Sequence, residues 1–163
     1  MGTDTGIYKL VLLLHIVAVV VGIGGTMLNG VYAAKAKKAG GPAAGAIMQA
    51  NFDVTMIAEK IIYTIPIWGI LLVVMSDKAF EFSQAWISIS LVLYIVALGI
   101  AHGVMVPSAK KMFAVGAKMG SGQGGPSDVA EAEGLQKKLA AGGMSLNLLA
   151  VALIALMIWK PGL

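Results

Sequence analysis

The stretch LVLLLHIVAVVVGIGGTMLNGVYAA, residues 10–34, carries no charged side chain and decides the class of fold. A helix needs about 20 predominantly apolar residues to cross the hydrocarbon of a bilayer, whereas the apolar core of a cleaved signal peptide has about 7–15. The stretch therefore predicts a transmembrane helix. Within it stand one histidine, His15, and a run of small residues that begins at Gly22.

The composition extends this prediction to the whole chain. Of the 163 residues, 58% are hydrophobic and 12% are charged, whereas a soluble domain carries roughly 25% charged residues. A water-soluble fold of this size cannot bury so much apolar surface. The absence of cysteine excludes disulfides, thiolate metal sites and iron–sulfur clusters. We therefore expect an integral membrane protein whose first partner is the lipid bilayer.

Charge-poor stretches place four spans along the chain. The predicted fold is an all-α, four-helix transmembrane bundle in a single domain, residues 1–163, with spans at about 8–34, 54–76, 83–109 and 139–159. The link after the second span is short, which makes the second and third helices antiparallel neighbours. The longer connections are residues 35–53 and 110–138.

The basic residues give the orientation. All twelve are lysines, and nine of them lie between residues 35 and 60 or between 110 and 138. Lysine-rich connections face the cytoplasm, so we expect both chain ends outside, a short outer link, and a long inner link with a Gly-rich hinge at 120–126. The expected location is the plasma membrane. The lack of arginine and of a basic stripe argues against a nucleic-acid partner.

Two histidines are the candidates for chemistry within the spans. Helix geometry places His15 about 9 Å inside the outer edge of the hydrocarbon and His102 about 12 Å inside the inner edge. The resulting offset of roughly 9 Å along the membrane normal disfavours the two rings as a pair on one iron. Spacing alone favours a packing role for each histidine, and as candidate haem axial ligands His15 ranks ahead of His102.

Polar residues from three predicted helices reach comparable depths in the inner half of the membrane. They are Asn29, Glu59, Tyr63 and His102, and they predict one hydrogen-bonded cluster. Ionisable groups inside a membrane mark proton or ion paths, so this cluster is the candidate for such a path. Pro66, nearby in sequence, predicts a kink in the second helix.

Small residues predict where helices touch, because helix contacts in lipid depend on close approach of the backbones. The residues expected at such contacts are Gly22, Thr26, Gly30, Gly99, Gly103 and Gly143. Their spacing favours packing within one molecule over a dimer motif.

The spans show no catalytic constellation. Ser88, Ser90 and Ser145 have no histidine and carboxylate at a matching depth, and the ten methionines form no copper-binding ladder. The sequence therefore favours a non-enzyme, with no metal site beyond a haem iron.

Four different short motifs are distributed along most of the chain. They are LHIVAVVVGIGG at Leu14–Gly25, Trp86 at the start of the third span, Pro107 with the lysines that follow it, and the ending Trp159-Lys-Pro161. Together they resemble a bacterial family of predicted integral membrane proteins of unknown function. That family is in turn distantly similar to copper-resistance D domains and to haem-containing protoporphyrinogen oxidases. The resemblance implies a haem-ligand role for His15, while the third-helix lysine of those oxidases has no counterpart in residues 82–109.

Three functions follow from these observations. The first is a non-enzymatic accessory or interaction subunit of a membrane assembly, with other membrane subunits or a second copy of the chain as partners. The alternative is a protein that binds b-type haem, or copper, through His15 in redox or tetrapyrrole metabolism. The third is a small transporter or proton path that uses the polar cluster.

Overall fold

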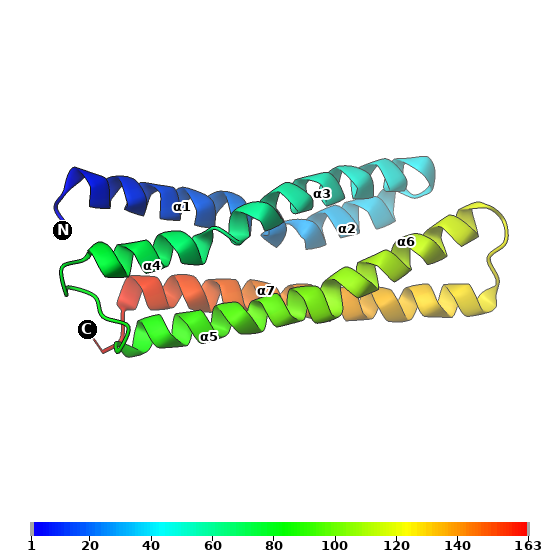
Figure 1. The fold of residues 1–163 in the computed structure, drawn as a ribbon. Coiled ribbons are helices and arrows are strands. Elements are labelled where there is room, and N and C mark those ends of the chain that lie inside the picture. Colours follow the sequence, from blue (N-terminus) through cyan, green and yellow to red (C-terminus); the bar gives the residue numbers. More distant parts are fainter. Residues whose placement is uncertain (1, 163) are drawn as a thin grey trace. The chain divides into compact units, whose positions relative to one another are not determined.

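The computed structural model describes residues 2–162, and every regular element within that range is helical. Figure 1 shows their succession along the chain. The elements are α1 (Gly6–Met27), α2 (Asn29–Ala39), α3 (Gly41–Ile62), α4 (Ile65–Met75), α5 (Ala85–Ile100), the π-helix η1 (Ala101–Met105), α6 (Val106–Gly120) and α7 (Pro126–Trp159).

These elements join into four long apolar helices that are able to cross a membrane. They are Gly6–Ala39, Gly41–Met75, Ala85–Gly120 and Pro126–Trp159, which confirms the prediction of an all-helical chain with four spans. Each is 34 to 36 residues long, or about 50 Å, against about 30 Å of hydrocarbon. The helices therefore continue past the predicted spans, and much of the connections 35–53 and 110–138 is helical.

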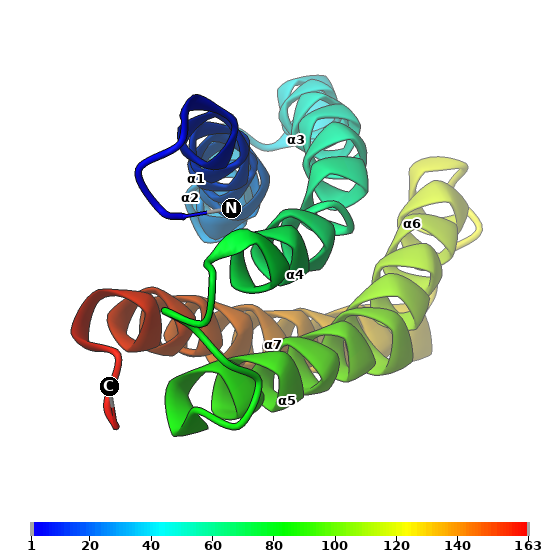
Figure 2. The same ribbon diagram turned by 60° about the vertical axis from the view of Figure 1, so that its left-hand side comes forward.

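The chain divides into two compact units, one that runs up to Ile89 and includes the C-terminal residues from Lys160, and one from Ser90 to Trp159. In the first unit α1 and α2 run one way, and α3 and α4 run back beside them (Figures 1 and 2). The reversal takes place at Gly40 and Gly41, whose φ angles are 65° and 50°. Residues with a side chain rarely adopt this left-handed backbone conformation, so the two glycines allow α3 to begin only two residues after α2 ends.

The first unit packs with the spacing of a coiled coil. In α1 the buried residues alternate three and four apart, at Tyr8, Val11, His15, Ala18 and Gly22. The helices that run back beside it, α3 and α4, bury residues that are spaced seven apart: Asn51, Ala58, Ile65 and Leu72. A seven-residue repeat keeps one face toward the partner helix and produces left-handed packing.

Glycines let the two helices of this unit approach closely. A Cβ atom on Gly22 would lie 2.9 Å from Cγ1 of Ile62, and one on Gly25 would lie 3.0 Å from Cβ of Ala58. Both distances are shorter than side chains tolerate without movement. The predicted contact at Gly22 is therefore made with the last turn of α3.

The C-terminal end of the chain contacts the start of α5. The Lys160 ammonium lies 4.6 Å from the ring centroid of Phe80 and 5.8 Å from that of Trp86. The two rings meet edge to face, with centroids 5.6 Å apart. Cation–π attraction thus ties Lys160 to the link between α4 and α5.

In the second unit α6 and η1 pack against α7. At the end of η1 the Val106 N–H bonds the carbonyl of Ala101, five residues earlier, which makes this turn a π-turn. The next residue, Pro107, has no backbone N–H and so interrupts the regular hydrogen bonding of the helix at the same place. Opposite this turn, a Cβ on Gly142 would come 2.6 Å from Sδ of Met105. A short loop then joins α6 to α7, which begins at Pro126.

Replacing Gly22 with valine tests the close approach of the first unit. Gly22→Val forces α1 away from Ile62, and overpacking of this kind costs about 1–3 kcal/mol. We expect a fall in Tm of several degrees in detergent, at roughly 2–4 °C per kcal/mol. Gly24→Val is the matched control, because nothing lies within 4 Å of its Cβ position. Equal melting of the two variants would contradict the packing described.

Candidate functional site

His15 is held between two helices of the first unit. Its side chain is 8% exposed, and its Nδ1 lies 3.2 Å from the backbone carbonyl oxygen of Ile65, at the start of α4. A carbonyl oxygen can only accept a hydrogen bond, so Nδ1 carries the proton in this contact. In the neutral ring the lone pair is then on Nε2, which is the nitrogen available to a metal.

The local sequence explains why this carbonyl faces the ring. The helix breaks at Tyr63 and Thr64, and α4 restarts at Ile65 with Pro66 in its first turn. This break lies where Pro66 predicted a kink. One turn later, Gly69 leaves the space that the ring occupies: a Cβ at Gly69 would lie 3.3 Å from Cε1 of His15.

Two parts of this site were missed in the sequence. The hydrogen-bond acceptor is a backbone atom of Ile65, which has no signature in residue type. Gly69 does have a signal, because it lies within the seven-residue repeat between Ile65 and Leu72. In the same part of α4, Trp68 packs against the buried cluster of Tyr8, Val11 and Leu72.

Three residues of the predicted polar cluster, Asn29, Glu59 and Tyr63, make hydrogen bonds in the first unit. The Tyr63 hydroxyl donates to Oε1 of Glu59 at 2.5 Å. The Asn29 side-chain oxygen accepts from the Thr55 hydroxyl at 3.1 Å. His102 belongs to the second unit, where it is exposed within η1. The cluster as a whole stays a prediction.

A further polar residue near this region was not expected. Asn51 lies one turn before Thr55, whose hydroxyl contacts the Asn51 carbonyl at 2.8 Å. The side-chain oxygen of Asn51 is buried and has no hydrogen-bond partner among the described residues. Such an atom costs free energy unless a water molecule or a moving partner satisfies it.

The small residues predicted at helix contacts differ in their surroundings. Gly22 meets Ile62, and Gly143 has Cε of Met105 at 4.0 Å from its Cβ position. The Thr26 hydroxyl bonds the carbonyl of Ile23 within its own helix, at 2.9 Å. The positions with open space at the Cβ are Gly30, Gly99 and Gly103. Closer contacts occur at two glycines not singled out, Gly25 and Gly142.

The donor set bears on which metal His15 could serve. Residues 2–162 contain no group of three or more histidine, cysteine, aspartate or glutamate side chains that could hold a metal ion. A copper ion bound as a bare ion needs several such donors. A haem iron has four ligands from the porphyrin, so one protein imidazole is enough to hold it. One imidazole is therefore a sufficient protein ligand for haem, whereas a bare ion would need further donors.

Comparison with known proteins agrees with the membrane assignment. A family model described as "Predicted integral membrane protein (DUF2269)" matches residues 9–161, nearly the whole chain. No curated protein and no solved structure matches the chain. The resemblance to a membrane family of unknown function is thereby confirmed, while the more distant similarity to copper-resistance domains and haem oxidases stays a prediction.

Two substitutions of His15 test the contribution of its hydrogen bond to the Ile65 carbonyl. His15→Asn keeps an N–H donor close to the place of Nδ1, whereas His15→Leu removes it. We expect His15→Leu to be less stable than His15→Asn by about 1 kcal/mol, the net value of one buried hydrogen bond. Denaturant unfolding in detergent measures the difference. If the leucine variant were as stable as the asparagine variant, the hydrogen bond to Ile65 would make no contribution to the free energy of unfolding.

Proposed function

The chain belongs to the DUF2269 family of predicted integral membrane proteins, and from that premise we propose that it is a multi-pass protein of the bacterial cytoplasmic membrane that binds b-type haem through His15. The orientation proposed with it places the two lysine-rich connections in the cytoplasm. The observation that supports this function is the hydrogen bond from Nδ1 of His15 to the Ile65 carbonyl.

That hydrogen bond is the usual support of a metal-bound histidine. Imidazoles that bind metals donate their other ring N–H to a carbonyl or carboxylate, which fixes the tautomer and raises the basicity of the coordinating nitrogen. In this chain the Ile65 carbonyl holds the proton on Nδ1 and leaves Nε2 as the ligand atom. Gly69 allows the ring to lie against α4 without a side chain between them.

The surroundings of His15 also suit a large apolar cofactor. The neighbours Leu14 and Ile16 are apolar and exposed on the surface of α1, so the part of α1 around His15 carries no charge. When bound, haem would supply one-electron redox chemistry or a tetrapyrrole substrate. The residues of this chain would bind and orient it, with His15 as the residue whose imidazole holds the iron.

An accessory or interaction subunit is the second candidate. Three polar side chains of the first unit, Thr26, Thr55 and His15, make hydrogen bonds inside that unit, as packing residues do. In this interpretation His15 serves only to fasten α1 to α4. A folded protein that binds no haem would favour this role.

A role as a transporter or proton path is supported by one observation. The bonded pair of Tyr63 and Glu59 offers one exchangeable proton near the end of α3. A path would need the Glu59 carboxylate to accept a proton and release it again, so Glu59→Gln should abolish proton flux in liposomes. Flux that is unchanged in this variant would remove Glu59 from any path.

Haem binding by the purified protein tests the principal proposal. Full-length chain reconstituted with haem b should show a Soret band, and His15→Asn should weaken binding by at least about tenfold, the scale on which metal-site ligation matters. His102→Asn is the matched control and should bind haem as the parent does. Circular dichroism verifies that both variants remain helical. A parent protein that stays colourless with haem, or equal binding by His15→Asn, would contradict the proposal.

A further inference from the structure

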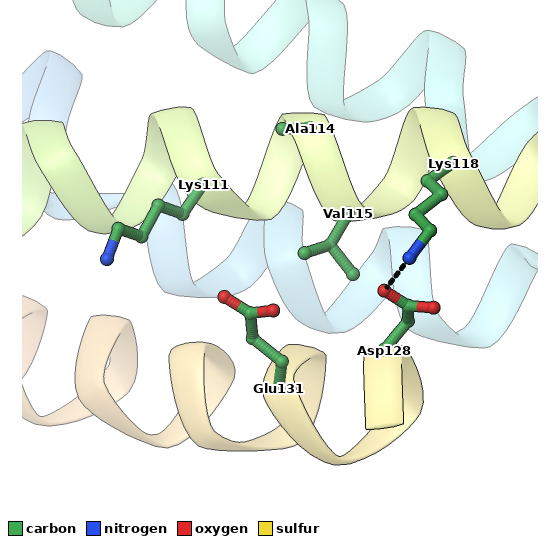
Figure 3. A pocket seen from close by; sticks show the side chains of 6 residues that line it. All are labelled: Lys111, Ala114, Val115, Lys118, Asp128 and Glu131. Carbon is green, nitrogen blue, oxygen red and sulfur yellow. Dashed lines mark hydrogen bonds and ion pairs between the residues drawn. The ribbon is translucent and has the colours of Figure 1, made fainter. Parts of the chain in front are cut away.

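The second unit contains a cleft that is lined by charged side chains. It has a volume of about 320 Å³ and lies between α6 and the first turns of α7 (Figure 3). Its lining consists of Lys111, Ala114, Val115, Lys118, Asp128 and Glu131. Two lysines and two carboxylates thus face a space of the size that a small polar group fills.

One of the two opposite-charge pairs in the cleft is closed. The Lys118 ammonium lies 2.8 Å from one oxygen of Asp128, and the other Asp128 oxygen accepts the N–H of Gly125 at 2.8 Å. Figure 3 shows this pair at one end of the cleft. Both oxygens of Asp128 are therefore bonded, one joining α6 to α7 and the other joining the loop to α7.

The other two charges are open. Within residues 2–162 neither the Lys111 side chain nor the Glu131 side chain makes a hydrogen bond or an ion pair. Both side chains reach toward the space between the helices (Figure 3). One cation and one anion that share a cleft without bonding each other are complementary to a ligand that carries both charges.

The position of the cleft along the helices indicates where such a ligand comes from. Lys111 lies two residues past the predicted end of the third span, or about 3 Å, and Glu131 lies eight residues before the fourth span, or about 12 Å. Lys111 is therefore nearer the hydrocarbon than Glu131. In a phospholipid with an ethanolamine head group, the phosphate is likewise nearer the hydrocarbon and the ammonium is farther out.

We propose that this cleft binds a phosphoethanolamine head group, with the phosphate on Lys111 and the ammonium on Glu131, and that the membrane phospholipid is its source. A lysine ammonium donates hydrogen bonds to phosphate oxygens, and a carboxylate accepts hydrogen bonds from a primary ammonium. Free phosphoethanolamine offers the same two charges, so the test must separate it from the lipid. The proposal uses only the membrane setting and does not depend on haem binding.

Native mass spectrometry of the full-length chain in detergent measures the binding. The probes are phosphatidylethanolamine and phosphatidylglycerol with identical acyl chains, and free phosphoethanolamine is added as a competitor. We expect phosphatidylethanolamine to bind roughly tenfold more tightly, the ratio that one charge-assisted hydrogen bond supplies. Free phosphoethanolamine at the same concentration should not displace it. Equal binding of the two lipids, or displacement by the free compound, would overturn the proposal.

Charge-removing variants assign the two contacts separately. Glu131→Gln should bring the two lipids to equal affinity, because only the ammonium contact is lost. Lys111→Gln should weaken both, because each lipid carries a phosphate. The matched controls are Glu133→Gln and Lys110→Gln, whose side chains lie outside the lining of the cleft. If the controls changed lipid binding as much as the cleft variants, the cleft would not be the site.

Discussion

Hydrocarbon offers no hydrogen-bond partner, and this constraint governs the polar groups of the spans. The ring N–H of His15 finds the Ile65 carbonyl, and the Thr55 hydroxyl reaches Asn29 on the facing helix. Each of these bonds joins the two long helices of the first unit. The same atoms that would be costly in lipid therefore fix how that unit packs, and they leave Nε2 of His15 as the nitrogen available to a ligand.

The seven-residue repeat makes these bonds possible across a broken helix. Asn51 and Ala58 lie before the break at Tyr63 and Thr64, while Ile65 and Leu72 follow it in the same register. The break thus changes local hydrogen bonding without turning the buried face away from α1. It also brings a backbone carbonyl beside a histidine, an arrangement that a continuous helix makes harder because its carbonyls point along its own axis.

Hydropathy predicted the four spans and the all-helical class, because charge-free runs of this length have few other stable forms. It did not predict that residues 35–53 and 110–120 would be largely helical, since polarity marks the edge of the hydrocarbon and not the end of a helix. The hydrogen bond between Asn29 and Thr55 was not predicted, because depth in the membrane does not give the direction in which a side chain points around its helix.

The claim on which this account depends is that the Ile65 carbonyl fixes the proton of His15. Nitrogen-15 NMR of histidine-labelled protein in lipid bilayers measures it directly, with the His15 signals assigned by their loss in His15→Asn. The account predicts a neutral ring with the proton on Nδ1 and an unprotonated Nε2. A ring protonated on Nε2 alone, or on both nitrogens, at neutral pH would contradict it.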